Sequence, residues 1–223
     1  MINTDVRRSA SGKTSPTKNL AHHELRAFQQ FDIPSSAGFL YGWGLNPDES
    51  ENMQPQVTQL ITLKNAWMAS HILDAEFPTP LSQQGLAIYK AAQAERNATQ
   101  IHNAPSHAQS DLLSFYPVDC HPLTIRYALV SASQWADQES EAMVEFLTQI
   151  MLDNNSPARL YVGFYQGKPA ACGMIFSHPD CPDVTLISDV CAIPQANQEA
   201  LTEAMTAWLI EQVSEQADQL WIC

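Results

Sequence analysis

The stretch that decides the fold is RLYVGFYQGKPAACGMIF at residues 159–176, followed closely by VTLISDVCAIP at residues 184–194. The first contains two apolar, β-rich runs, Leu160–Tyr165 and Ala170–Phe176, separated by a turn sequence, QGKP. The second is apolar on both faces, which is typical of a strand in the middle of a sheet, and it ends at Pro194. Together they predict a β-hairpin beside a central strand.

The segments around this core predict further elements of one sheet. Asn197–Gln216 has one apolar stripe at helical spacing, and Leu220–Cys223 reads as a short strand that returns parallel to the central one. Upstream, Leu123–Val130 reads as a first strand and Asp137–Leu152 as a helix. The resulting order predicts an α+β fold with a mixed sheet flanked by helices.

The first half of the chain has a different character. Residues 1–20 are rich in Ser, Thr and basic residues and predict a flexible tail, whereas residues 21–117 predict a mostly helical region packed on the C-terminal part. The region around residue 100 reads as a linker. The helices expected in this half are Gln54–Ala75, Leu81–Ala98 and Ser106–Phe115.

Composition is that of a globular chain, with 45% hydrophobic residues among 223. The chain lacks an apolar run of membrane-spanning length and an apolar core near the N-terminus, which predicts a cytoplasmic protein. Its five cysteines form no CxxC pair and are odd in number, as expected of free thiols. The His and Cys residues lack the paired spacing of a zinc site, so we expect no metal.

The formal net charge of −13 comes from 24 acidic residues against 11 Lys plus Arg, and four of those cations lie in residues 1–20. This balance argues against binding to nucleic acid or to an anionic membrane, because phosphate attraction supplies most of such affinity. It suits a substrate that is an amine. The alternative is that the acidity serves solubility alone.

With these elements in order, residues 121–223 resemble the GNAT superfamily, the GCN5-related N-acetyltransferases. The hairpin is similar to the second and third strands of that family, and ISDVCAIP is similar to its fourth. The resemblance implies that acetyl-CoA or another acyl-CoA lies with its arm along the fourth strand and its diphosphate at the start of the next helix. The implied binding residues are Val190, Cys191, Ala192, Asn197, Gln198, Glu199 and Ala200.

The chain departs from the family pattern in two places. The glycines of the phosphate-loop signature are replaced, and Glu199 and Glu203 put negative charge at that loop. The family's last helix and strands, which often carry a tyrosine acid, have no counterpart after Cys223. Either the N-terminal region supplies this part, or a second subunit does so in a homodimer. The aromatic candidates in the N-terminal region are Tyr41, Trp43, Tyr89 and Tyr116.

Asp189 is the candidate general base, because it precedes the backbone expected to contact the donor. The alternative for this carboxylate is a salt bridge at the sheet. Two functions follow from the sequence. In the first, the protein is an N-acyltransferase that moves an acyl group from acyl-CoA to an amine of a small molecule or peptide. In the second, it is a GNAT-like protein that binds a ligand or partner without catalysis.

Overall fold

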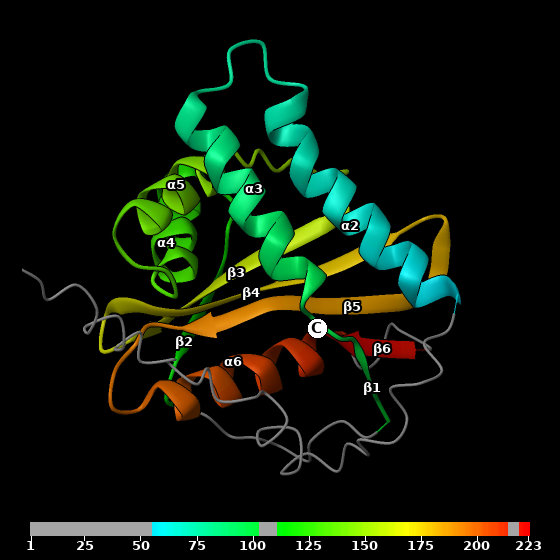
Figure 1. Ribbon diagram of the computed structural model, residues 1–223. Coiled ribbons are helices and arrows are strands. Elements are labelled where there is room, and N and C mark those ends of the chain that lie inside the picture. The colour runs from blue at the N-terminus through cyan, green and yellow to red at the C-terminus, as the bar shows by residue number, and fades with distance from the viewer. Residues whose placement is uncertain (1–54, 103–110, 214–218) are drawn as a thin grey trace, which may run out of the picture. The chain divides into compact units, whose positions relative to one another are not determined.

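The computed structural model describes residues 55–102, 111–213 and 219–223, which form a six-stranded mixed sheet with helices on both faces (Figure 1). The predicted tail at 1–20, together with Tyr41 and Trp43, lies outside the described residues. The helices are α2 (Pro55–Leu73), α3 (Pro80–Ala94), α4 (His121–Ala132), α5 (Asp137–Leu147) and α6 (Gln198–Val213). The strands are β1 (Thr99–Ile101), β2 (Ser114–Pro117), β3 (Ala158–Tyr165), β4 (Lys168–His178), β5 (Cys181–Ala192) and β6 (Gln219–Ile222).

The strands lie in the order β1-β6-β5-β4-β3-β2. Neighbouring strands from β2 to β5 are antiparallel, β6 is parallel to β5, and β1 is antiparallel to β6. The α+β fold with a mixed sheet is therefore confirmed, as are the hairpin of β3 and β4, the central strand β5, helix α6 and the returning strand β6.

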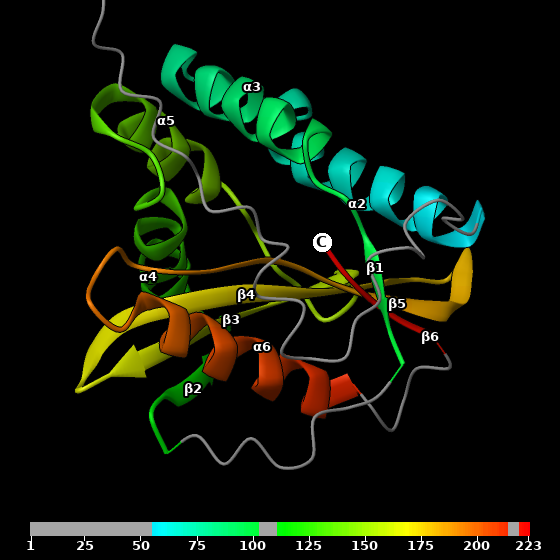
Figure 2. The same cartoon turned by 60° about the horizontal axis from the view of Figure 1, so that its bottom comes forward.

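Two buried hydrophobic clusters lie on opposite faces of the sheet. One includes the apolar faces of α2, α3, α4 and α5 with side chains such as Val162, Met174 and Leu186 of the strands. The other joins α6 to the opposite sheet face through side chains such as Ile175 and Ile187. In Figures 1 and 2 the long helices α2 and α3 lie on the side of the sheet away from α6. The N-terminal helices therefore pack on the central strands.

Two predictions in the middle of the chain are wrong. Leu123–Val130 belongs to helix α4, not to a strand, and it buries Thr124, Tyr127 and Ala128 at helical spacing. A run of apolar and β-branched residues cannot by itself separate a strand from a buried helix, and Pro122 in the first turn favours the helix. The first strand of the antiparallel set is instead β2, which takes the last residues of the helix predicted over 106–115.

The N-terminal region supplies an edge strand of the sheet. Thr99–Ile101, predicted as part of a linker, pairs along its length with β6 as β1. The part that follows the last strand in the family was expected either from the N-terminal region or from a second subunit. At this edge of the sheet, the N-terminal region of the same chain pairs with β6. The homodimer stays a prediction.

Helix α3 packs against α5 with a very close approach at Gly85. A Cβ built on Gly85 would collide with the backbone carbonyl of Ala142 and lie 2.6 Å from Cβ of Phe146. A glycine at this position lets the two helices approach, and this contact fixes where the polar residues in the second half of α3 meet the sheet.

Candidate functional site

The site begins with an irregularity in β5. The register with β4 shifts by one residue between Cys172 and Met174, so that β5 carries an extra residue after Ser188. Asp189 has a φ of 55°, in the left-handed region that Asp tolerates better than most residues. A bulge of this kind turns two successive side chains, Ser188 and Asp189, towards the same sheet face, where α2 and α3 lie.

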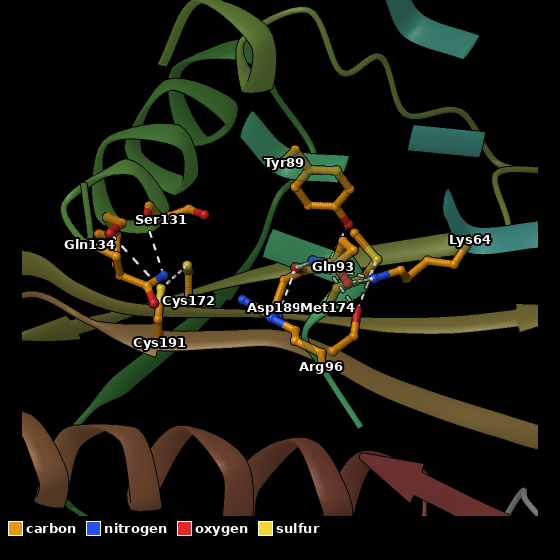
Figure 3. Close-up of polar contacts among 12 residues, drawn as sticks. Lys64, Tyr89, Gln93, Arg96, Ser131, Gln134, Cys172, Met174, Asp189 and Cys191 are labelled. Carbon is orange, nitrogen blue, oxygen red and sulfur yellow. Dashed lines mark hydrogen bonds and ion pairs between the residues drawn. The ribbon is translucent and has the colours of Figure 1, made fainter. Parts of the chain in front are cut away.

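The carboxylate of Asp189 is the centre of a buried polar cluster (Figure 3). Its Oδ2 accepts from Ser188 Oγ at 2.8 Å, from the Tyr89 hydroxyl at 3.1 Å and from Lys64 Nζ at 3.4 Å. Its Oδ1 accepts from Gln93 Nε2 at 2.8 Å and from Arg96 Nη1 at 3.1 Å. We call these six residues the apex cluster.

Each donor of the apex cluster comes from an element whose local structure aims it there. Lys64 belongs to the buried face of α2, and its ammonium also donates to Gln93 Oε1 at 2.7 Å. Tyr89 and Gln93 are one helical turn apart on α3 and share its buried face. Arg96 directly follows Glu95, which caps the C-terminus of α3, and the Arg96 backbone N–H donates to the Gln93 carbonyl.

Burial alone raises the pKa of Asp189, but Lys64 and Arg96, with the hydrogen bonds from Ser188 and Tyr89, outweigh burial and lower the pKa to about 2. Burial raises the pKa of Tyr89 well above its ordinary value, and the charge of Asp189 raises it further. Asp189 is therefore ionised and Tyr89 neutral at neutral pH. The cluster combines two cations with one anion.

These contacts bear on the two interpretations of Asp189. A carboxylate with a pKa of about 2 and donors on both oxygens is a weak base, since the ideal catalytic pKa lies near the working pH. The geometry favours the alternative, an ion pair at the sheet. Of the candidate acids, Tyr89 is buried in this cluster, whereas Tyr116 lies on β2 at the opposite edge of the sheet.

The pairing between β5 and β6 reaches as far as the apex cluster. Their pairing runs from Val184 with Gln219 to Ile187 with Ile222, and the Cys223 N–H donates to the Ile187 carbonyl. Beyond that point β6 has ended, and in the described part of the chain the rest of β5 has a strand partner only in β4 (Figure 1). The backbone of the predicted donor-binding residues Val190, Cys191 and Ala192 thus lies on this half-paired segment.

The backbone groups of Ala192 point to the unpaired edge. Ile193 donates to the Ala170 carbonyl, so the alternation of an antiparallel ladder turns the N–H and C=O of Ala192 away from β4. The Ala192 carbonyl is already occupied, because Gln198 Nε2 donates to it at 3.1 Å. The Ala192 N–H also points to this edge, and Ala192 as a whole is completely buried.

The predicted diphosphate site lies at the start of α6. A short connection leads from β5 into the helix, with Leu201 donating to the Asn197 carbonyl as the first turn closes. Gln198, Glu199 and Ala200 form that first turn, and all three are exposed. A helix start attracts an anion, but the carboxylate of Glu199 opposes one. The residues thus fit an acyl-CoA only in part, because Cys191 and Ala192 of the strand are buried and the exposed helix start carries an opposing charge.

The side chains of Cys191 and Trp208 lie away from the unpaired edge of β5. The thiol of Cys191 faces the core, 3.4 Å from Sγ of Cys172 on β4 (Figure 3). Trp208 of α6 stacks on Phe115 with 4.5 Å between ring centroids and meets Tyr161 edge-on. Its ring therefore lies over β2 and β3, so it does not fill the space beside β5.

Reasoning from the sequence missed most of the apex cluster. Lys64, Gln93, Arg96 and Ser188 were not predicted as site residues. One signal was visible, because Lys64 interrupts an otherwise apolar stripe in the predicted helix, and a buried lysine requires a partner. The other three are polar residues without a local pattern.

Comparison with known proteins shows similarity in structure alone. No protein-family model and no curated protein matches the chain. A GCN5-related N-acetyltransferase from Kribbella flavida is 14% identical with a TM-score of 0.37, over 62% of this chain and 53% of the other, or about half its length. An aminoglycoside acetyltransferase from an uncultured soil metagenomic sample, solved with trehalose, is 10% identical with a TM-score of 0.37, over 51% and 78%.

Similarity at this level does not determine activity, so function must be inferred from the site. Within the described ranges, no helix is long and apolar enough to cross a membrane. The same residues contain no group of three or more His, Cys, Asp or Glu side chains that could hold a metal ion.

Proposed function

We propose that the protein is an N-acyltransferase that moves an acetyl or other acyl group from acyl-CoA to an amine of a small molecule or peptide. The donor's arm lies along Val190–Ala192, and its diphosphate lies at Asn197–Ala200. The observation that carries this proposal is the bulge at Asp189, after which β5 pairs with β4 and leads into the start of α6. An extended arm with amide groups can bond to an unpaired strand edge as an added strand does.

The apex cluster has a defined part in this proposal. It anchors the bulge at Asp189 to α2 and α3, and so sets the course of β5 towards Val190. Asp189 then acts as a positioning residue that shapes the donor site. This role follows from its low pKa and its five donors, which do not suit a general base.

A second function has its own supporting observation. Gln198 donates to the Ala192 carbonyl, so this acceptor on the edge of β5 is not free for the arm of CoA. Glu199 adds negative charge at the start of α6, which disfavours a diphosphate there. A GNAT-like protein that binds another ligand or partner without catalysis would show these features. A cytoplasmic address and a homodimer are compatible with either function and remain predictions.

The test is a calorimetric titration with acetyl-CoA, with desulfo-CoA as a probe of the arm and diphosphate. We expect micromolar binding of both. Ala192→Pro removes the N–H on the unpaired edge, and Ala192→Gly keeps it. The proline variant should bind desulfo-CoA about fivefold more weakly than the glycine variant, the value of one hydrogen bond. An absence of heat at millimolar ligand would favour the second function.

A further inference from the structure

The apex cluster has more positive than negative charge. Lys64 and Arg96 both contact Asp189, while Tyr89, Gln93 and Ser188 are neutral partners. Among these six residues two cations contact one carboxylate, and Cys223 at the end of β6 adds negative charge near Arg96. A cation in a partly desolvated position attracts an opposite charge more strongly than one on the open surface does. In a chain with a net charge of −13, two cations held side by side are a local feature.

The two cations differ in access. Lys64 is completely buried, and its ammonium is shared between Asp189 and Gln93. The side chain of Arg96 is 26% exposed and donates from Nη1 to Asp189, its one hydrogen bond within the described part of the chain. A guanidinium has five N–H donors, and in Figure 3 that of Arg96 extends from Asp189 towards the side of β5 that carries Cys191.

Arg96 lies beside the bulge of β5, with its Nη1 3.1 Å from Asp189 Oδ1. Burial lowers its pKa, but Asp189, then Cys223 beyond the end of β6, Tyr89, and Cys191 on β5 raise it overall. Residues of β5 and the residue after β6 are thus close enough to influence the same guanidinium. In an acyltransferase with the donor along β5, this is the position near the group that is transferred.

We propose that Arg96 binds a carboxylate of the substrate beside the bulge of β5 at Asp189. The inference rests on the proposed function and specifies its substrate class. Arginine suits this task because its planar fork matches a carboxylate and because Asp189 already holds it in place. The carboxylate belongs either to a dicarboxylic acyl group or to an amino-acid-like acceptor.

The experiment has one arm for each source of the carboxylate. In the first, calorimetry compares succinyl-CoA with acetyl-CoA. In the second, release of free CoA from acetyl-CoA is followed with a mixture of amino acids and with the same amino acids as their amides. In one of the two arms, the ligand that carries the carboxylate should bind or react about tenfold better than its partner without it. This factor is about the value of a charge-assisted hydrogen bond.

Three variants identify Arg96 as the source of that preference. Arg96→Gln removes the charge and should abolish the preference, while Lys64, Tyr89 and Gln93 still hold Asp189 and so keep desulfo-CoA binding measurable. Arg96→Lys keeps a cation beside Asp189 but lacks the planar fork of the guanidinium, so it should keep part of the preference. If Arg96→Gln does not fold, Arg96→Lys should still fold and can be tested in its place. Arg126→Gln is the control, because Arg126 is an exposed arginine that bonds only to a carbonyl of its own helix, within the described residues.

Two outcomes would overturn the inference in distinguishable ways. If desulfo-CoA binds but neither arm favours the carboxylate, or if the preference survives in Arg96→Gln, Arg96 has no such role and the proposed function stands. If desulfo-CoA does not bind, the proposed function fails and the inference fails with it.

Discussion

The two ends of the proposed donor site are built in opposite ways. At the apex, residues from α2, α3 and the segment after α3 converge on one buried carboxylate of β5. At the start of α6, exposed side chains follow a short connection, and the polar contact described there, from Gln198 to Ala192, spans six residues of the chain. The apex depends on tertiary structure, and the helix start depends on local sequence.

Because of this difference, we expect substitutions at the apex to affect stability and substitutions at the helix start to affect ligand binding. Changes at the apex alter buried charges and should affect folding, because a buried ion without its partner is costly. Changes at the helix start alter exposed charges and should affect an anionic ligand while the fold is nearly unchanged. The predictions below test this division from the larger expected effect to the smaller.

The largest effect is expected for Asp189→Asn. Asparagine keeps the size and tolerates the φ of 55°, but it leaves Lys64 and Arg96 without a counter-charge. The free energy of unfolding in urea should fall by about 3–5 kcal/mol, as when one partner of a buried pair is removed.

The matched control is Asp183→Asn, an exposed aspartate on the same strand, for which we expect a change within about 0.5 kcal/mol. Adding Lys64→Met to Asp189→Asn should cost less than the sum of the single changes, because the two groups interact directly. Equal unfolding midpoints for the two aspartate variants would mean that the apex cluster does not hold β5.

The same division explains how far the sequence could predict this molecule. Helices α2, α3 and α6 and strands β3, β4, β5 and β6 carry their patterns locally, and their existence followed from periodicity. Strands β1 and β2 are too short for a pattern, and α4 has an apolar run that resembles a strand. In the apex cluster, Lys64 and Asp189 are 125 residues apart and Arg96 and Asp189 are 93 apart. Sequence spacing contains no information on such contacts.

An intermediate effect is expected from acid. The pKa of Asp189 is about 2 in the folded protein and near 3.8 when unperturbed, so the unfolded chain takes up its proton first as pH falls. The stabilisation is complete above about pH 4 and is lost as pH falls towards 2, which amounts to about 2 kcal/mol.

The measurement is urea unfolding of the wild type and Asp189→Asn between pH 7 and pH 2. Other carboxylates titrate in both proteins, so the difference between the two unfolding free energies isolates Asp189. That difference should be constant from pH 6 to about pH 5 and should narrow between about pH 4 and pH 2. A difference that narrows between pH 7 and pH 5 would indicate a raised pKa and would restore Asp189 as a candidate base.

The smallest effect is expected at the other end of the site, for Glu199→Gln. Removing this carboxylate from the first turn of α6 removes repulsion of a diphosphate, so desulfo-CoA should bind about two- to fivefold more tightly at low salt. Stability should fall slightly, because an acid at a helix start is favourable for the helix itself. Glu141→Gln, an exposed acid in α5, controls for net charge and should change neither property. Tighter binding in both variants would reflect the overall charge of the chain, and unchanged binding in Glu199→Gln would mean that the diphosphate does not lie at this helix start.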